Sequence, residues 1–341
     1  MGGQVRLGLA GCGKAGQKYL QAIVHLPEAE LVAAFDTNYE VARRAALAFD
    51  VPAYDTLETM LRAIQLDGII VASPTATHGP IALTAIANGV SVLVEQPMAL
   101  TLAEAAAMVQ KAKAAGVILA EAHSVRLLPA IQQVARAVRS GRLGTVVQAH
   151  AQVVAPRSDP YYEESPWRLD PTKSGGLIFS EAIALFDVLI SLLGPVQEIY
   201  AQANYAVHHR PVEDVLSVQG QFQSGALATL NATTVGIKAG SAELLALVGT
   251  QGAAGIGPTL QGIQGWTVDG DDEDSVRQRL RELPARTSWQ SSWDALDDFV
   301  RALEQGGTPV LAACHGLDTV AAAQAVERSV ESGHVVRLDS A

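Results

Sequence analysis

The sequence predicts an α/β protein of two domains: a doubly wound parallel sheet, followed by an α+β domain with an open, mostly antiparallel sheet. Up to about residue 122, short apolar runs alternate with segments of helical period. From residue 123 onward, apolar and polar residues alternate, as in strands with one covered face. The 341 residues are too many for one ordinary core, so we expect domains at 1–122 and 123–341.

Five apolar runs predict the strands of the first domain: 5–10, 31–35, 68–72, 90–94 and 117–120. Continuous apolar runs are typical of parallel strands that are covered on both faces. One of the helices between them has clear boundary signals, because Thr101 and Glu104 form a capping box and Gly116 follows as a C-terminal cap. Repeated strand and helix units of this kind indicate a doubly wound sheet.

The second half has a different pattern. Residues 146–154 alternate between polar and apolar side chains, and 215–222 and 226–233 do the same around Ser224 and Gly225. The last two segments therefore predict a tight hairpin in an antiparallel sheet. A later helix, beginning near Trp293, carries one apolar stripe and ends at two glycines: Leu296, Phe299, Val300 and Leu303, then Gly306 and Gly307.

Composition excludes several classes of partner. The chain has 24 Lys and Arg against 35 Asp and Glu, a formal charge of −11, so phosphate backbones and anionic membranes would repel it. Cys12 and Cys314 lie at opposite ends and form no disulfide framework, which predicts a reducing compartment, the cytoplasm. The most apolar stretch, 176–194, is interrupted by Glu181 and Asp187, so no membrane span is expected.

A glycine-rich loop follows the first strand and opens a helix. Its glycines form the pattern GxGxxG, in which the first permits a tight turn and the second lets a pyrophosphate approach backbone N–H groups. The third allows the helix and strand to pack closely. The alternative is a purely structural glycine turn. The motif predicts a Rossmann domain that contacts a dinucleotide through Gly11, Gly13, Lys14, Ala15 and Gly16.

Asp36 ends the second strand, about 20 residues after the last glycine of the loop. Its carboxylate is expected to accept hydrogen bonds from the adenosine ribose hydroxyls. The same negative charge repels a 2′-phosphate, so the sequence favours NAD as cofactor, with NADP less favoured. Arg43 and Arg44 on the next helix are cations that would attract a 2′-phosphate and so favour NADP.

Two later motifs carry a family resemblance: Ser73-Pro74-Thr75-Ala76-Thr77-His78 after the third strand, and Glu95-Gln96-Pro97 after the fourth. With 123–129, Trp167-Arg168 and 175–187, the chain resembles the glucose-fructose oxidoreductase, inositol dehydrogenase and rhizopine catabolism (GFO/IDH/MocA) oxidoreductases. The resemblance implies hydride transfer between a nicotinamide and a carbinol carbon, usually of a sugar or cyclitol. It also implies cofactor contacts from Ser73, Pro74, Thr75, His78, Glu95, Gln96, Trp167 and Arg168, and makes Gln96-Pro97 a candidate cis peptide.

The chain departs from this family at its proton-transfer residues. Members usually have Glu-Lys-Pro, whose lysine bonds the reacting hydroxyl and relays its proton, where this chain has Gln96. They also tend to have an acid and a histidine where this chain has Ser180 and Ala184, ahead of Asp187. A glutamine can hold a hydroxyl but cannot titrate, and neither serine nor alanine is a general base at neutral pH.

Three residues are candidates for the missing proton transfer. His123 lies just past the last Rossmann strand, Tyr161 lies in the loop 156–171, and Lys173 precedes the glycine pair. Each has a structural alternative: a locally bonded histidine, a packed aromatic ring and an exposed loop lysine. We therefore expect the catalytic set to be Gln96 with His123, Tyr161 or Lys173.

The sequence thus predicts an NAD(P)-dependent oxidoreductase with a non-standard catalytic set, acting on a polar, sugar-like or cyclitol-like small molecule. Two alternatives stay open: an NAD-binding homologue without dehydrogenase turnover, acting as a sensor or partner subunit, and a non-redox enzyme that uses bound NAD transiently. We expect a dimer or tetramer formed through the open sheet, since its uncovered face otherwise stays in water.

No metal site is expected. The adjacent residues His208 and His209 would point to opposite sides of an extended segment. The acidic run 269–274 lacks the residue order of an EF-hand, so a solvated turn is the preferred interpretation.

Overall fold

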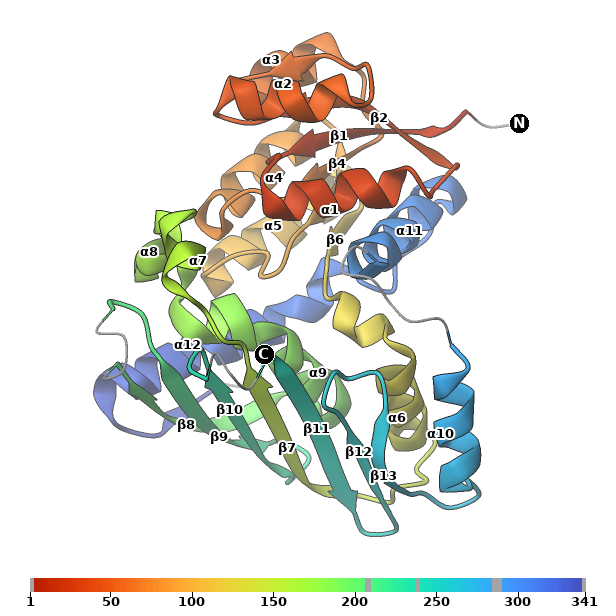
Figure 1. The fold of residues 1–341 in the computed structure, drawn as a ribbon, viewed down its shortest axis with the longest axis vertical. Coiled ribbons are helices and arrows are strands. Elements are labelled where there is room, and N and C mark those ends of the chain that lie inside the picture. Colours follow the sequence, from red (N-terminus) through yellow and green to blue (C-terminus); the bar gives the residue numbers. More distant parts are fainter. Residues whose placement is uncertain (1–2, 206–209, 237–239, 284–289, 339–341) are drawn as a thin grey trace. The chain divides into compact units, whose positions relative to one another are not determined.

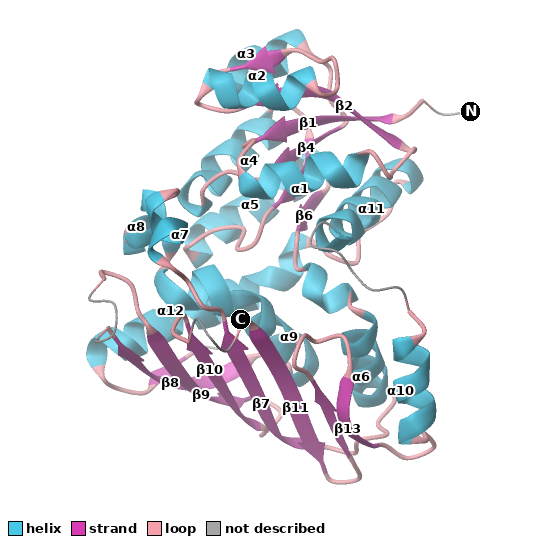
Figure 2. Ribbon diagram, in the orientation of Figure 1, coloured by secondary structure: helices cyan, strands magenta, loops and turns pink. Residues whose placement is uncertain are grey.

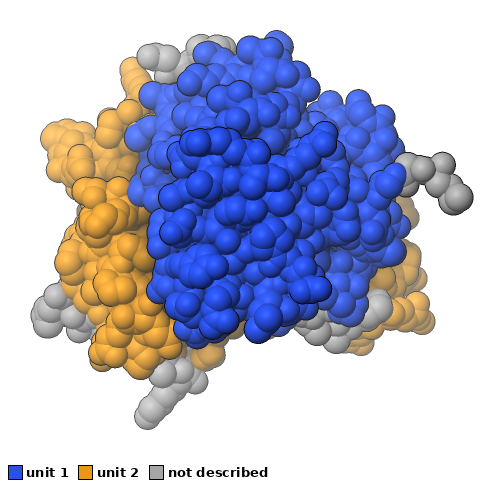
Figure 3. Space-filling model, turned by 90° about the horizontal axis from the view of Figure 1, so that it is seen from above, with its two compact units in different colours: residues 1–124, 286–317 blue, residues 125–285, 318–341 orange. Residues whose placement is uncertain are grey.

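The computed structural model describes residues 3–205, 210–236, 240–283 and 290–338, which fall into two compact units (Figure 3). Unit 1 comprises residues 1–124 and 286–317, and unit 2 comprises residues 125–285 and 318–341. The segment 286–317 thus returns to unit 1, although the sequence predicts a single division at residue 122. The reason is apolar packing, because Phe299 of this segment lies against Gly68 and Leu7 of the first sheet.

Unit 1 contains a six-stranded sheet in the order β3-β2-β1-β4-β5-β6, with every neighbouring pair parallel (Figures 1 and 2). This confirms the predicted doubly wound sheet. Its strands are β1 (Val5–Ala10), β2 (Ala29–Phe35), β3 (Ala53–Tyr54), β4 (Gly68–Val71), β5 (Ser91–Val94) and β6 (Leu119–Glu121). The strand order reverses at β1, so the loops after β1 and β4 share one edge of the sheet, where such folds bind ligands.

The helices of unit 1 begin and end where local signals place them. The Thr101 hydroxyl accepts a hydrogen bond from Glu104 N at 3.2 Å, and Gly116 has a left-handed φ of 67°, so the predicted capping is confirmed. The elements are α1 (Lys14–Ile23), α2 (Tyr39–Leu47), α3 (Leu57–Ala63), η1 (Thr75–Thr77), α4 (His78–Ala87), α5 (Leu102–Ala115), α11 (Gln290–Gln305) and η5 (Ala313–Gly316).

Unit 2 contains an eight-stranded sheet in the order β13-β12-β11-β7-β10-β9-β8-β14. Its pairs are antiparallel except β7 with β10, which confirms a mostly antiparallel sheet. The long helical connection after β7 lets the chain start β8 in the same direction as β7. The strands are β7 (Val146–Val154), β8 (Val196–Asn204), β9 (Val215–Phe222), β10 (Leu227–Thr233), β11 (Ala242–Gly249), β12 (Ala253–Ile256), β13 (Ile263–Thr267) and β14 (Val336–Arg337).

Helices cover one face of this sheet, with α9 against β7 and α12 against β8 (Figure 1). In β9, Leu216 and Val218 are buried toward the helices while Ser217 and Gln219 are exposed, so the predicted alternation is confirmed. The elements are η2 (Ser124–Leu127), α6 (Pro129–Arg139), α7 (Asp159–Glu163), η3 (Pro166–Leu169), α8 (Pro171–Ser174), a π-helical turn (Ile178–Ala182), α9 (Ile183–Leu193), α10 (Glu273–Arg281) and α12 (Leu317–Ser332).

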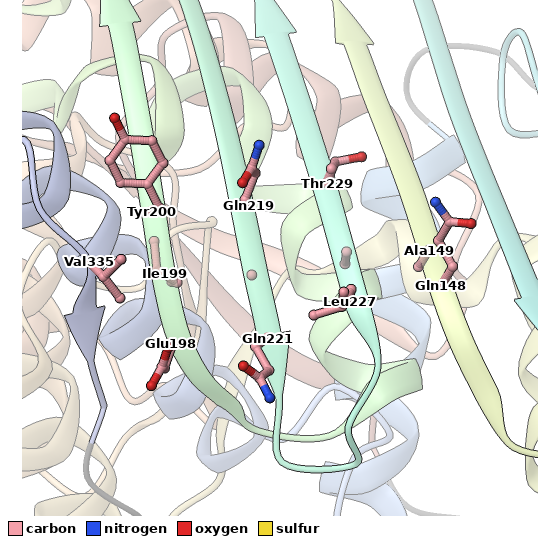
Figure 4. A pocket seen from close by; sticks show the side chains of 12 residues that line it. Gln148, Ala149, Glu198, Ile199, Tyr200, Gln219, Gln221, Leu227, Thr229 and Val335 are labelled. Carbon is pink, nitrogen blue, oxygen red and sulfur yellow. The ribbon is translucent and has the colours of Figure 1, made fainter.

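The opposite face of the sheet is open. A hollow of about 330 Å³ lies on it, and both polar and apolar side chains line it (Figure 4). Tyr200, Gln219, Thr229 and Gln148 project to this side from β8, β9, β10 and β7. Leu227 stands among them with 59% of its surface exposed. The face is therefore partly apolar, and the described residues leave it uncovered.

The segment Pro171–Leu193 is long and apolar enough to cross a membrane by length and composition alone, with a mean hydropathy of 2.0. However, 72% of that window is buried within the structure. This is the environment of a buried core helix, and it includes the carboxylate of Asp187.

Candidate functional site

The glycine loop after β1 has the geometry that its sequence predicts. Gly11 has a φ of +93°, and a Cβ there would lie 2.6 Å from the backbone of Ala72 and Ser73. A Cβ at Gly16 would lie 2.1 Å from the carbonyl oxygen of Gly11. In contrast, no atom lies within 4 Å of the Cβ position at Gly13. Packing thus requires glycine at positions 11 and 16, whereas Gly13 leaves open space beside α1.

The N-terminus of α1 lies at this open space. No side chain caps it at Gly13, and its first turn contains no acidic residue. The backbone N–H groups of that turn and the positive end of the helix dipole are therefore available to a pyrophosphate. Lys14 and Ala15 are the first residues of the helix, as the predicted cofactor contacts require. The donors present fit a dinucleotide.

Asp36 is held by backbone donors at the end of β2. Its Oδ2 accepts a hydrogen bond from Cys12 N at 3.0 Å, and its Oδ1 accepts one from Asn38 N at 2.9 Å. The carboxylate is thereby fixed near the glycine loop, where a ribose diol of the cofactor would need it. The Arg43 guanidinium, which could attract a 2′-phosphate, instead bonds Glu40 at 3.0 Å.

The thiol of Cys12, in the glycine loop, is unreactive at neutral pH. Burial, together with the Asp36 carboxylate, raises the pKa of Cys12 to about 12. Its Sγ lies 3.6 Å from the carbonyl oxygen of Phe35. A thiol of this kind remains protonated at neutral pH and is a poor nucleophile.

His78 joins the loops that follow β4 and β5. Its Nε2 lies 2.8 Å from the carbonyl oxygen of Ser73, and its Nδ1 lies 2.8 Å from that of Pro97. The ring is 2% exposed, and this burial lowers the pKa of His78. The peptide between Gln96 and Pro97 is cis, as the sequence predicts. A neutral imidazole has one N–H and therefore donates to one of these two carbonyl oxygens, while the buried ring packs between both predicted cofactor loops.

Gln96 presents an acceptor with no partner. Its side-chain Oε1 is buried, yet among the described residues nothing donates to it. Buried polar atoms normally have a hydrogen-bond partner, so an unsatisfied amide oxygen at the ligand-binding edge of the sheet fits a site for a donor on a bound molecule. A substrate hydroxyl is such a donor.

His123 and Glu121 form a buried pair at the end of β6. His123 is 4% exposed, and its Nε2 lies 3.0 Å from Glu121 Oε1. The same carboxylate oxygen accepts a hydrogen bond from Met98 N at 2.8 Å. The structure therefore places this histidine against a carboxylate of its own unit, at the end of the same strand. The sequence reasoning overlooked Glu121, although a carboxylate in an otherwise apolar strand was a signal.

In unit 2, Tyr161 lies between two guanidinium groups. Those of Arg157 and Arg168 stand 4.5 Å and 4.2 Å from its ring centroid. Its hydroxyl donates to Glu181 Oε1 at 3.1 Å. Burial, followed by the Glu181 charge, raises the pKa of Tyr161 to about 12 despite the opposing arginines. The phenol is therefore both packed and a hydrogen-bond donor at neutral pH.

A small pocket of unit 2 brings Tyr161, Arg168 and the departure position Ser180 together. It is lined by Tyr161, Tyr162, Arg168, Leu177, Ser180, Glu181, Val212, Glu213 and Thr234. Arg168 also lies 5.2 Å from the Trp167 ring. Lys173 is not among the lining residues: its ammonium pairs with Asp170 at 2.9 Å and its side chain is 56% exposed. This matches the exposed-lysine alternative.

Glu181 and Asp187 both serve ion pairs. Glu181 binds Arg157 through two hydrogen bonds of 2.7 Å and 2.6 Å. Asp187, which is fully buried, binds Arg126 through two bonds of 2.5 Å and also accepts from the Thr319 hydroxyl at 2.8 Å. The predicted position of the family histidine, Ala184, offers only a methyl group.

Across the described ranges, no three His, Cys, Asp or Glu side chains come together as candidate metal ligands. His208 and His209 lie outside those ranges. In the acidic run 269–274, Asp271 pairs with Arg142 at 2.9 Å and accepts a hydrogen bond from the Trp266 indole at 3.1 Å. That carboxylate therefore holds the turn to its neighbours.

Comparison with known proteins identifies the family. Residues 5–123 match the oxidoreductase family with an NAD-binding Rossmann fold, and residues 131–254 match the GFO/IDH/MocA C-terminal domain. D-apiose dehydrogenase of Paraburkholderia graminis is 28% identical over 97% of this chain and 89% of its own. Myo-inositol 2-dehydrogenase of Thermotoga maritima is 24% identical over 98% of this chain and 99% of its own.

The WlbA dehydrogenase from Bordetella pertussis, solved in complex with NADH and UDP-GlcNAcA, has a TM-score of 0.92. It is 26% identical, with 99% of each chain covered. The matched NAD-binding domain and the geometry of the glycine loop both indicate a dinucleotide site, and the cofactor is NAD. The chain belongs to the GFO/IDH/MocA family of oxidoreductases.

Proposed function

We propose that the protein is an NAD-dependent oxidoreductase that acts on a carbinol or carbonyl carbon of a polar, sugar-like or cyclitol-like molecule, with a non-standard catalytic set. The buried, unpartnered Oε1 of Gln96 carries the proposal, because it is an acceptor suited to a substrate hydroxyl. Relatives named for apiose and myo-inositol support the substrate class.

When bound, NAD supplies the hydride acceptor. Gln96 accepts a hydrogen bond from the reacting hydroxyl and orients it, but its neutral amide cannot take the proton. A second group must do so. We place Tyr161 first, since its oxygen can receive a proton while its own passes to Glu181 at 3.1 Å. His123 is engaged by Glu121, and Lys173 by Asp170.

Steady-state NADH formation over a panel of polyols, sugars and cyclitols tests the function. Wild type should reduce NAD with at least one alcohol, and Tyr161→Phe should lower kcat by about 100-fold or more while leaving NAD affinity unchanged. Lys173→Ala is the matched control, because that ammonium pairs with Asp170 on a side chain that is 56% exposed. No turnover on any alcohol or carbonyl, with NAD still bound, would refute the function.

One set of residues favours a second candidate, an NAD-binding homologue without dehydrogenase turnover. Gln96, Ser180 and Ala184 together remove the usual proton-transfer groups of the family, while the glycine loop and Asp36 are intact. The same panel separates the two candidates. A non-redox enzyme with transient use of NAD would convert a substrate without net NADH formation, which product analysis would reveal.

NAD should bind more tightly than NADP. The carboxylate of Asp36 is fixed by two backbone N–H groups, and Arg43 is paired with Glu40, so a 2′-phosphate meets a negative charge. Fluorescence titration with each cofactor gives the ratio of the dissociation constants of NADP and NAD. The variant Asp36→Ala should bring this ratio closer to one. Equal or tighter NADP binding by wild type would show that Arg44 determines the preference instead.

We further propose that two copies of the chain associate through the open face of the unit 2 sheet. Leu227→Lys places a charge within that hollow, at a residue 59% exposed, and should shift the protein toward monomer in light scattering at micromolar concentration. Leu47→Lys, on α2 and 71% exposed, should leave the mass unchanged. A wild-type monomer would contradict the proposal.

A further inference from the structure

The turn after β5 is held from two directions. On one side, His78 Nδ1 lies 2.8 Å from the carbonyl oxygen of Pro97. On the other, Glu121 Oε1 accepts a hydrogen bond from Met98 N at 2.8 Å. Gln96 directly precedes Pro97 and Met98. Its backbone therefore leads into a turn in which the Pro97 carbonyl lies against His78 and the Met98 amide is held by Glu121. Its side-chain oxygen nevertheless has no partner of its own among the described residues.

The Glu121 carboxylate is itself tightly enclosed. The residue is 2% exposed, and its Oε1 also lies 3.0 Å from His123 Nε2. A distant segment closes over it, because Glu121 N donates to the carbonyl oxygen of Leu311 at 2.9 Å. At Gly316 the contact is closest, since a Cβ there would lie 1.9 Å from Glu121 Oε2. Only glycine leaves the carboxylate where it is.

We propose that Glu121 is a positioning residue for catalysis. By holding the Met98 amide, with His123 fixing the carboxylate in turn, it aims the Gln96 amide at the reacting hydroxyl. In this proposal Glu121 takes no substrate proton: its Oε1 accepts from the Met98 amide, and its Oε2, which has no hydrogen-bond partner among the described residues, is buried against Gly316. The inference rests on the proposed role of Gln96, and it assigns His123 to the support of that role.

The first test moves the carboxylate without changing it. Gly316→Ala places a methyl group against Oε2 and should lower kcat by about 10- to 100-fold, the cost of a misplacement near 1 Å. NAD affinity should stay at the wild-type value, because the glycine loop and Asp36 are untouched. The matched control is Gly307→Ala, in the same unit, where no atom lies within 4 Å of the added Cβ.

The second test separates positioning from general support of the fold. Glu121→Gln keeps an oxygen that accepts from the Met98 amide, so this variant should retain most of the wild-type kcat. Glu121→Leu removes the acceptor, so its kcat should fall. Kinetics are measured well below the unfolding midpoint of each variant. Equal kcat in Glu121→Gln and Glu121→Leu would overturn the proposal, as would a kcat for Gly316→Ala equal to that of Gly307→Ala.

A readout independent of turnover keeps this inference distinct from the proposed function. Amide hydrogen exchange at Met98 should be slow in wild type, Gly307→Ala and Glu121→Gln, and faster in Gly316→Ala and Glu121→Leu. If wild type turns over no alcohol but this exchange pattern holds, the proposed function fails and the fixing of the turn by Glu121 stands. Uniform exchange across the five proteins would refute the role of Glu121 directly.

Discussion

Asp187→Ala is expected to lower the free energy of unfolding by about 3–5 kcal/mol, the cost of breaking a buried ion pair from one side. Asp187 is fully buried in α9 and binds Arg126 through two 2.5 Å hydrogen bonds. Alanine leaves the guanidinium, only 15% exposed, without its carboxylate. It also leaves the Thr319 hydroxyl without the acceptor that it has at 2.8 Å.

Denaturant titration followed by circular dichroism measures this loss. The double variant Arg126→Met with Asp187→Leu should recover much of it, because a well-packed apolar pair avoids the uncompensated charge. Glu40→Ala, which breaks the exposed pair with Arg43, serves as a control with little or no loss. A loss for Asp187→Ala as small as that control would show that this buried pair does not stabilise unit 2.

The parts of the fold that follow local rules were predictable. Strands 5–10, 146–154 and 215–222 have the bounds that their apolar runs or alternation predict. β11 (Ala242–Gly249) was not predicted, because its apolar run alternates poorly and reads equally well as a helix. The return of α11 to unit 1 depends on the packing of Phe299 against Gly68, a contact between distant segments that no local pattern contains.

The same contrast divides the candidate site. The cofactor half depends on backbone geometry that adjacent residues dictate, such as the φ of +93° at Gly11, so the motif alone predicted it. The catalytic half depends on partners far apart in the chain. His123 could be named from its place after β6, but the hydrogen bond that joins Glu121 to the Met98 amide, 23 residues away, exists only once the sheet has formed.

Gln96→Lys alone is expected to give no gain in turnover on sugar or cyclitol alcohols. If the protein were a family dehydrogenase that had lost only its lysine, the substitution would restore an ammonium at the reacting hydroxyl. The amide oxygen that it replaces is buried, so the new charge carries a desolvation cost. Neither Ser180 nor Ala184 supplies the acid or the histidine that would complete a proton relay.

Steady-state NADH formation should therefore be compared among wild type, Gln96→Lys, and Gln96→Lys with Ser180→Asp and Ala184→His. Only the triple variant is expected to gain, by on the order of two decades or more, since that is what a restored proton-transfer group contributes. NAD affinity should change little in every variant, because the glycine loop and Asp36 keep their contacts. A clear rise in the single variant would contradict the proposal that another group, such as Tyr161, has replaced the family lysine in proton transfer.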